Sequence, residues 1–360
     1  TGGSNTGGSN TGGSNTGGSN TGGSNTGGSA PGGAGGMPMT GSAWMAAAAN
    51  LAGVDSECGN VSGMASRPDR DMLIVGVAKQ GLWASTNGSA MWTKLGTGAG
   101  SAMIVNRSLT YIFDPAHPDT WWESGIYNGG GVYRTTDNGN TFVQLGDTHH
   151  NDGFSVDLTD PDRKLLLAGG HEMGQHLIKS VDGGMTWTDI GMKLPASAGA
   201  TSWPHIVDSK TFLVATYNSG EGGIFRSTDG GETWTRVAKG AFSSAAVVGY
   251  DKAIFWTRQG PGGVRSTDNG ATWTEFGNNP SPGNQLVELP DHRLVSILDR
   301  KMVYSSDRGA SWKSAGPDLP WSANGLVYSS FRKAIYAYHF GCGNGSVPVQ
   351  ADQIVRLPFE

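Results

Sequence analysis

The chain reads STDGGETW at residues 227–234, and its fold follows from this eight-residue turn. The pattern Ser/Thr-x-Asp-x-Gly-x-x-Trp/Phe returns at residues 135–142, 180–187, 266–273 and 305–312. A degraded copy at residues 85–92 has Asn87 at the Asp position and Ser89 at the Gly position. Because the copies recur about every 40 to 50 residues, each belongs to one supersecondary unit of a repeat architecture.

The residue types of this repeat suit a tight turn between two strands. Asp can fold its carboxylate back onto backbone N–H groups two residues on, and Gly takes the positive φ that such a turn demands. The aromatic residue is then placed to bury its ring at the start of the next strand. We therefore expect structural roles, rather than catalysis or ligand binding, for the aspartates of the turns: Asp137, Asp182, Asp229, Asp268 and Asp307.

These turns resemble Asp-boxes, which are also called BNR repeats. Proteins that carry this repeat include sialidases, sortilin-type receptors, xyloglucan-cleaving propellers and a photosystem II assembly factor. The resemblance covers residues from about 60 to 315 and implies an all-β fold, the β-propeller. It implies no single reaction, because the families that share the box differ in function.

The repeats predict a single propeller of seven blades with four short strands each, and six blades are the alternative. Strands are expected near residues 325–330, 333–338 and 353–357, after the last box, and no seventh box supplies an outer strand. The segment 42–47 contains Trp44, the residue type that such an outer strand carries. We therefore predict that this segment closes the ring. A frayed tail or a short helix is the alternative, since Ala is a poor strand former.

The first 40 residues differ from the rest in composition. TGGSN repeats without change before TGGSA and PGGAGG, and no charged residue occurs before Asp55. Such a Gly/Ser/Asn tract cannot bury apolar surface, so residues 1–40 are expected to be a flexible linker. Residues 41–360 are expected to form the propeller, a fold that grows by repetition rather than around one core.

Net charge and the first residue bear on partners and location. The net charge of −5 argues against a nucleic-acid surface, and no apolar run is long enough to span a bilayer. The chain starts with Thr1 rather than Met, which is typical of a removed leader; an artificially trimmed chain is the alternative. We expect a secreted or cell-surface monomer without a cofactor. A lipid anchor would precede the linker if the leader is a lipoprotein signal.

The two cysteines, Cys58 and Cys342, fall in loops of the first and the last predicted blade. Ring closure would make these blades neighbours and place both loops on the same face. We therefore expect a disulfide between Cys58 and Cys342, which suits an oxidising compartment.

In a propeller the box turns lie on one face, and the loops around the channel mouth lie on the other. The resemblance to sialidases implies that ligands bind at this second face. Its densest polar group comes from two loops of the third predicted blade: His149, His150, Asp152, His171 and Glu172. Imidazole and carboxylate groups together relay protons or hold a metal ion. Polar lining of the channel, ligand contact or catalysis, and metal binding all stay open; no metal ligand is assigned, because no metal motif occurs.

Further side chains are predicted at the same mouth. Tyr127, Tyr217 and Arg258 are expected to contact a ligand, because aromatic faces stack on sugar rings while polar groups bind hydroxyls. Packing between blades is the alternative for the aromatic residues. For a glycosidase, the catalytic candidates are Asp152, Glu172, Glu123 and Glu221.

Three functions fit these features. The first is binding of a glycan or another extracellular ligand through the loop face. The second is glycoside hydrolysis, although the Phe-Arg-Ile-Pro motif of sialidases is missing ahead of the first box, and only residues 355–358 resemble it. The third is a protein-binding scaffold. A pair of opposed carboxylates at the mouth would favour an enzyme, whereas an aromatic shelf without such a pair would favour binding.

Overall fold

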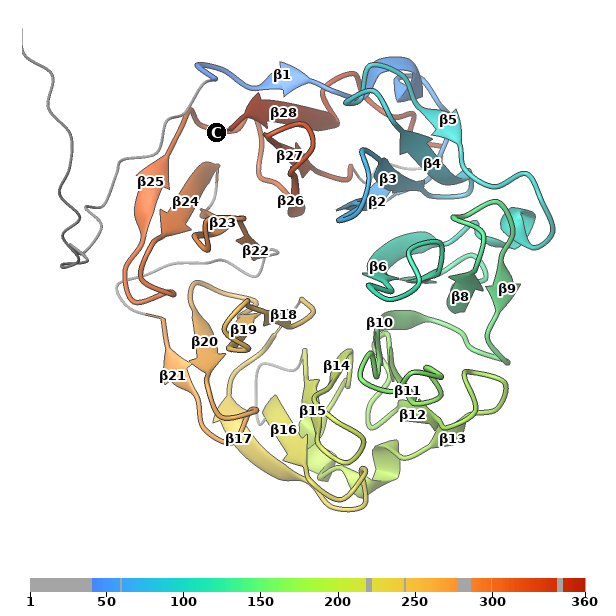
Figure 1. Cartoon of the computed structure of the whole chain (residues 1–360), viewed down its shortest axis with the longest axis vertical. Helices are drawn as coiled ribbons and strands as arrows, with labels where there is room; N and C mark the ends of the chain where they lie inside the picture. The colour runs from blue at the N-terminus through green and yellow to red at the C-terminus, as the bar shows by residue number, and fades with distance from the viewer. Residues whose placement is uncertain are drawn as a thin grey trace, which may run out of the picture. The chain divides into compact units, whose positions relative to one another are not determined.

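The computed structural model describes residues 41–58, 60–217, 222–242, 244–276, 286–298, 300–341 and 346–359. These residues form seven four-stranded antiparallel sheets, which are arranged as blades around a common axis (Figure 1). The predicted seven-bladed β-propeller is confirmed, and the six-bladed alternative is wrong. The predicted linker, residues 1–40, lies outside the described residues.

Each of the first six blades runs from its inner to its outer strand in chain order, and the seventh takes its outer strand from the start of the chain. Blade one consists of β2 (Val61–Ser66), β3 (Leu73–Val77), β4 (Gly81–Ser85) and β5 (Thr93–Lys94). Blade two consists of β6 (Arg107–Phe113), β7 (Trp121–Ile126), β8 (Val132–Thr135) and β9 (Val143–Gln144). Blade three consists of β10 (Asn151–Val156), β11 (Leu166–Gly170), β12 (Leu177–Ser180) and β13 (Thr188–Asp189). Blade four consists of β14 (Trp203–Ile206), β15 (Phe212–Ala215), β16 (Gly223–Ser227) and β17 (Thr235–Lys239). Blade five consists of β18 (Val247–Val248), β19 (Ile254–Thr257), β20 (Gly263–Ser266) and β21 (Thr274–Glu275). Blade six consists of β22 (Val287–Glu288), β23 (Leu294–Leu298), β24 (Lys301–Ser305) and β25 (Lys313–Ala315). Blade seven consists of β26 (Gly325–Ser329), β27 (Ala334–Tyr338), β28 (Ile354–Pro358) and β1 (Met45–Ala46), and short 3-10 turns lie at Ala49–Leu51, Ser101–Met103, Gly191–Lys193 and Ala196–Ala198.

Apolar clusters fill the spaces between neighbouring blades. Leu166 of β11 packs with Trp122 of β7 in the cluster between blades two and three. The box aromatic joins the cluster that its blade shares with the preceding one, as Trp187 does there and Trp273 does between blades four and five. A large ring that covers apolar surface of two blades contributes strongly to their association.

The chain closes its ring with its own N-terminal segment. β1 pairs with β28, and Met45 lies opposite Arg356. Trp44 packs against the cluster between blades six and seven, as a box aromatic does elsewhere, and its indole Nε1 donates to the carbonyl of Pro317 at 3.0 Å. The predicted closure is confirmed, and the paired strand is only two residues long.

The box turns satisfy their polar groups internally. In blade four, Asp229 Oδ2 accepts from the hydroxyl of Thr233 at 2.6 Å, and Oδ1 accepts from its backbone N–H at 2.9 Å. Ser227 Oγ donates to Asp229 and accepts from the N–H of Gly231, whose φ is 92°. Hydrogen bonds from Thr233 and Ser227 hold the pKa of Asp229 well below its usual range. The carboxylate therefore acts as the acceptor that keeps the turn closed.

Removing the buried box hydroxyl should weaken a blade. Ser227 is 1% exposed, and Ser227→Ala leaves the buried N–H of Gly231 without its acceptor. We expect the free energy of unfolding to fall by about 1 to 3 kcal/mol, measured by denaturant titration. Ser209→Ala makes the same change in an exposed turn and serves as the control. Equal stability of the two variants would contradict the structural role of the box.

A basic residue directly before the box Ser links three blades to the next one. Lys179 Nζ donates to the carbonyl of Gly230 at 2.9 Å, Arg226 Nε to that of Asn269 at 3.1 Å, and Arg265 Nη1 to that of Arg308 at 3.1 Å. In each case the accepting residue follows the Asp of the next box. The box turns therefore connect blades as well as strands.

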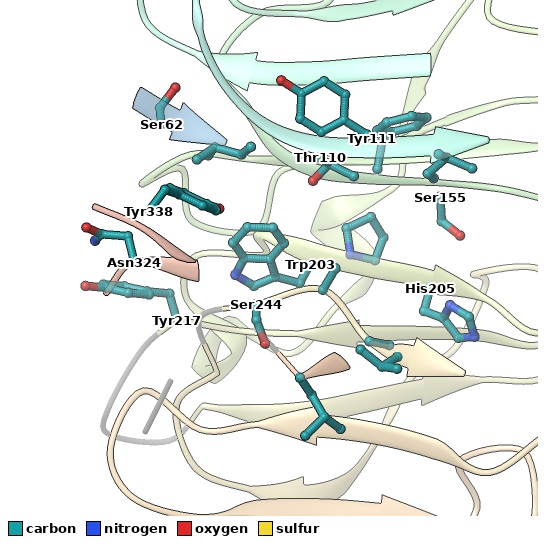
Figure 2. Close-up of a pocket in the computed structure, with 18 of the residues that line it drawn as sticks. Ser62, Thr110, Tyr111, Ser155, Trp203, His205, Tyr217, Ser244, Asn324 and Tyr338 are labelled. Carbon is teal, nitrogen blue, oxygen red and sulfur yellow. The ribbon is translucent and has the colours of Figure 1, made fainter. Parts of the chain in front are cut away.

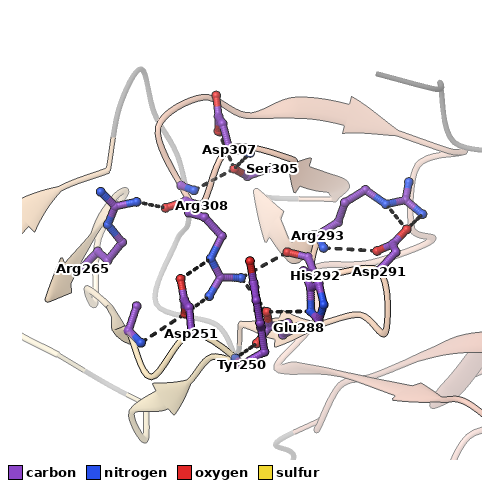
Figure 3. Close-up of polar contacts among 12 residues, drawn as sticks. Tyr250, Asp251, Arg265, Glu288, Asp291, His292, Arg293, Ser305, Asp307 and Arg308 are labelled. Atoms are coloured by element: carbon purple, nitrogen blue, oxygen red, sulfur yellow. Dashed lines mark hydrogen bonds and ion pairs between the residues drawn. The ribbon is translucent and has the colours of Figure 1, made fainter. Parts of the chain in front are cut away.

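Figure 3 shows a denser polar contact between blades five and six on the box-turn face. Arg308 Nη2 lies 2.6 Å from Asp251 Oδ1, and its Nη1 lies 2.5 Å from Glu288 Oε1. Its guanidinium lies over the ring of Tyr250, 5.0 Å from the centroid, and Tyr250 stacks on His292 with centroids 3.5 Å apart. This cluster lies at the end of the blades opposite to the loops discussed below.

The loop that contains Cys58 lies against residues 346–349 near the end of the chain. The N–H of Val347 donates to the carbonyl of Ser56 at 2.9 Å. Cys342 lies outside the described residues, so the disulfide stays a prediction, and the described part of the chain holds no free thiol. We expect thiol titration of the unreduced protein in denaturant to find no reactive cysteine; two reactive thiols would contradict the bridge.

Candidate ligand-binding site

A cavity of about 560 Å³ lies along the channel, between the inner strands of several blades (Figure 2). Its wall carries aromatic rings, hydroxyl groups and one side-chain amide. The aromatic residues include Trp203, Tyr217, Tyr338 and Phe340, the hydroxyls belong to Ser62, Thr110, Ser155 and Ser244 among others, and the amide belongs to Asn324. The described residues of this wall include no Asp, Glu, Lys or Arg.

Trp203 stands at the start of β14, and a glycine of the neighbouring blade makes room for its ring. A Cβ at Gly153 of β10 would lie 2.6 Å from the indole Cε3, so a larger residue there would displace the ring. Figure 2 shows the indole between Tyr217 and His205 along the channel. The sequence thus places a large aromatic side chain in the cavity wall, where it can contact a ligand.

Burial keeps two titratable groups of the wall, those of His205 and Tyr338, neutral at pH 7. Burial lowers the pKa of His205 to about 4, so its imidazole carries no charge. Burial also raises the pKa of Tyr338 to about 12, so its hydroxyl stays protonated. The cavity wall is therefore uncharged over its described residues, and it offers stacking surfaces and hydrogen bonds rather than ion pairs.

A second polar group, the Tyr127–His171–Asp152 cluster, lies on the loop face at blades two and three. Asp152 is in β10, His171 follows β11, and Tyr127 follows β7. His171 Nδ1 lies 2.8 Å from Asp152 Oδ1, and its Nε2 lies 2.9 Å from the hydroxyl of Tyr127. The hydrogen bond with Asp152 raises the pKa of His171. The two predicted loops of blade three therefore meet, and a loop of blade two joins them.

Two further side chains surround the ring of Tyr127. His150 meets it edge-on with centroids 5.2 Å apart, and the guanidinium of Arg107 lies over its face at 4.5 Å. Arg107 Nε is 3.2 Å from Glu57 Oε1, and Glu57 also pairs with Lys79 at 3.2 Å. This polar chain extends from blade one to blade three along the rim.

The other predicted residues of blade three stay at the edge of this cluster. His149 pairs with the exposed Asp147 at 2.7 Å and makes no contact with His171 that the structure records. The side chain of Glu172 is 75% exposed, and its Oε1 lies 3.8 Å from His171 Nε2. Only His150, Asp152 and His171 of the five predicted residues therefore form a compact group.

Glu123 does not lie at the channel mouth, contrary to the expectation from the sequence. It is in the middle of β7, directly opposite Tyr111 of β6, and its side chain is 0% exposed. Asn106 donates to one carboxyl oxygen at 3.4 Å, and burial raises the pKa of Glu123 to about 8. The residue is a buried carboxylic acid between blades, because β7 extends further than the sequence pattern indicated.

The remaining candidates have different surroundings. Tyr217 is 47% exposed and lines the cavity, as predicted for a ligand contact. Arg258 Nη2 is paired with Glu275 of β21 at 2.7 Å. Glu221 lies outside the described residues. Within the part of the chain that the structure describes, no group of three His, Cys, Asp or Glu side chains could hold a metal ion.

Several residues of the site did not stand out in the sequence. Ser62, Thr110 and Ser155 come from inner strands whose small hydroxyl residues look like ordinary strand residues. They stand at different places along these strands, so no shared position in the repeat marks them. Phe340 and Asn324 flank β27 and β26, and no motif marks them.

The comparisons with known proteins agree with this fold. The model of the BNR/Asp-box repeat matches residues 225–236, and no curated protein matches the chain. Among solved structures, a GH74 xyloglucanase from Xanthomonas campestris has 18% identity and a TM-score of 0.58 over 84% of this chain and 53% of its own. YCF48 from Cyanidioschyzon merolae has 13% identity and a TM-score of 0.55 over 88% and 98% of the two chains.

A third similar structure is the extracellular domain assigned to a one-component system from B. thetaiotaomicron, with 10% identity and a TM-score of 0.56 over 87% of this chain and 40% of that chain. This chain thus spans about half the length of the xyloglucanase, and at these identities the likeness concerns the fold alone. No helix among the described residues has the length and apolar character needed to cross a membrane. The recurring box, the matching repeat model and the seven blades make this chain an Asp-box (BNR-repeat) β-propeller.

Proposed function

We propose that this propeller is a secreted or cell-surface protein that binds a neutral glycan in its channel cavity. One observation carries the proposal: the described wall is aromatic and rich in hydroxyls, and it has no Asp, Glu, Lys or Arg. Apolar faces of sugar rings stack on aromatic side chains, while their hydroxyls exchange hydrogen bonds with polar side chains. A neutral carbohydrate satisfies such a wall without leaving a buried charge unpaired.

The same wall supports binding over hydrolysis. Most glycoside hydrolases place two carboxyl groups on either side of the scissile bond, about 5 to 9.5 Å apart. The described lining of the cavity has none, and Asp152 on the nearby rim is already paired with His171. Of the other predicted catalytic acids, Glu123 is fully buried, Glu172 is exposed, and Glu221 lies outside the described residues.

The similar structures guide the choice of probe. The fold resembles that of a xyloglucanase and that of an extracellular domain, which supports a polysaccharide ligand and a location outside the cytoplasm. Because the chain spans only 53% of the xyloglucanase, xyloglucan is a first probe rather than an assigned ligand.

Calorimetric titration with xyloglucan oligosaccharides, after a glycan array, tests the proposal. Ala245→Trp places a large ring in the cavity, and Tyr217→Ala removes an exposed ring from its wall. We expect each change to weaken binding about ten-fold or more, which corresponds to about 1.4 kcal/mol. Tyr250→Ala removes a 62% exposed tyrosine from the box-turn face and should bind like the wild type.

Two outcomes would count against the proposal. Unchanged affinity of the Ala245→Trp variant would place the ligand outside the cavity. An array on which no neutral glycan binds, together with capture of a protein ligand by the loop face, would favour the protein-binding scaffold.

A further inference from the structure

The Tyr127–His171–Asp152 cluster has no part in the proposed binding, yet it borders the cavity. Thr110, which lines the cavity, donates its hydroxyl to the carbonyl of Asp152 at 3.2 Å. A hydroxyl, an imidazole and a carboxylate joined in this order form an acid–base group, in which the imidazole exchanges a proton with the hydroxyl and the carboxylate orients the imidazole. When the Nδ1–H of His171 donates to Asp152, its Nε2 carries no proton and accepts that of the Tyr127 hydroxyl.

Three residues of the loops at this cluster have left-handed backbone conformations, which also occur in turns elsewhere in the propeller. Tyr127, His150 and Glu172 have φ values of 56°, 50° and 56°, in the left-handed region that residues with a Cβ rarely adopt. Such strain persists only where the surrounding structure enforces it, and it gathers at functional sites. Three loop residues that meet around His171 share this conformation, which fixes the positions of their side chains around the imidazole.

A cation completes the cluster. The guanidinium of Arg107 lies over the Tyr127 ring, 4.5 Å from its centroid. Arg107 Nε donates a hydrogen bond to Glu57. Among the described residues, the two terminal nitrogens of Arg107 have no hydrogen-bond acceptor. These nitrogens are arranged to bind a ligand carboxylate, because a guanidinium matches carboxylate geometry.

We propose that this cluster catalyses β-elimination on glycans that contain uronic acids, an activity that rests on the proposed function only in taking a glycan as ligand. Tyr127, with its own proton passed to His171, takes the proton from C5 of a uronate whose carboxylate pairs with Arg107. The electron pair of the C5–H bond forms the C4=C5 double bond, and the C4–O4 bond breaks. O4 then takes the proton from the Tyr127 hydroxyl, and His171 returns the proton it holds to the Tyr127 phenolate, which restores the neutral phenol and imidazole. The products are an unsaturated uronate and a new reducing end, without consumption of water or an oxidant.

Elimination suits this cluster better than hydrolysis does. Tyr127 supplies both the base and the acid, His171 holds the proton that Tyr127 gives up, and the single guanidinium supplies the charge that makes C5–H acidic. The nearest carboxylate, that of Asp152, is engaged by His171 and cannot act as a nucleophile at the same time.

The test is incubation of the full chain with polygalacturonate, alginate and glucuronan, followed by the ultraviolet absorbance of the C4=C5 product. We expect turnover of at least one polymer, and a loss of about 10²- to 10⁴-fold in Tyr127→Phe, which keeps the ring but removes the hydroxyl. His176→Gln is the matched control, because His176 pairs with Asp189 at 2.7 Å in the same blade without a tyrosine. Absence of turnover on all three polymers, or full activity of Tyr127→Phe in folded protein, overturns the proposal.

Asp152 is a positioning residue, and the pH profile of kcat/KM distinguishes this role from a structural one. The charged groups that face His171 are Asp152, Glu172 and Arg107, and the first of these raises the pKa of His171 most. Asp152→Asn should therefore move the acidic limb of the profile to lower pH, whereas a merely structural role would lower activity without moving the limb. Affinity of Tyr127→Phe for neutral oligosaccharides should stay unchanged. Loss of neutral-glycan binding alone, with turnover intact, would refute the proposed function and leave this site standing.

Discussion

The Glu123→Gln variant should become more stable relative to the wild type as the pH rises, by about 1.4 kcal/mol per pH unit between pH 4.5 and about 8. Over the whole window the gain amounts to roughly 4 to 5 kcal/mol, a large fraction of the stability of a folded domain. No other single substitution considered for this propeller is expected to change its pH dependence as much.

The burial of the carboxyl group explains this effect. Glu123 is 0% exposed between blades one and two, and Oε1 has no hydrogen-bond partner among the described residues. Ionisation would leave a buried charge, so burial raises the pKa to about 8 from the ordinary 4.5. Gly63 and Gly76 of blade one let β6 approach closely, because a Cβ at either would collide with Ser108.

The direction of this pH dependence follows from how many protons the folded and unfolded chains bind. The folded pKa lies above the unfolded one, so the native chain keeps a proton that the unfolded chain releases. The contribution to stability is complete below about pH 4.5 and is lost as the pH rises to about 8. An amide at this position does not ionise, so the Glu123→Gln variant does not lose this stability as the pH rises.

Urea unfolding of both proteins between pH 4.5 and 9 measures the effect as a difference. The pKa of His205 is lowered and that of His171 is raised, but both residues titrate in both proteins and cancel in the difference. Glu172→Gln, which removes a 75% exposed carboxylate, is the control. Parallel stability curves for wild type and Glu123→Gln would show that the buried acid is not protonated.

A chain that starts at residue 48 should be less stable than one that starts at residue 41 by roughly 3 kcal/mol or more. The shorter chain lacks β1 and Trp44, which together cover the outer edge of blade seven. It also lacks Ala47, whose N–H donates to Ile354 at 2.7 Å and whose carbonyl accepts from the indole of Trp92. The uncovered edge of β28 would then present unpaired backbone groups that favour association.

Thermal unfolding and sedimentation of the two chains measure these effects. The chain from residue 41 is the matched control, because both lack residues 1–40. Equal melting temperatures and equal sedimentation would contradict the assignment of β1 as the closing strand.

The sequence alone predicted most of the fold, because the box turn has a strict composition. Gly231 must adopt a positive φ and Ser227 must accept its N–H, so few other residue types can form the turn. Trp44 could be assigned to the closure because blade seven lacked an outer strand with an aromatic residue. The two-residue length of β1 could not be predicted, since pairing depends on where β28 lies.

The candidate site was only partly predictable. His171 and Asp152 stood out as polar residues expected between strands, although Asp152 lies within β10. The hydrogen bond of His171 with Tyr127 could not be predicted, because it depends on the angle between two blades. Glu123 was misplaced for a related reason: a charged residue within an apolar run usually marks the end of a strand, but here the buried acid is tolerated in its protonated form.

A crystal structure of the propeller with a bound neutral oligosaccharide tests the central claim most directly. The proposal predicts a sugar ring inside the channel cavity, stacked on Trp203 or Tyr217 and hydrogen-bonded to wall hydroxyls such as that of Ser244. An oligosaccharide bound on the box-turn face, with the cavity unchanged, would contradict the claim.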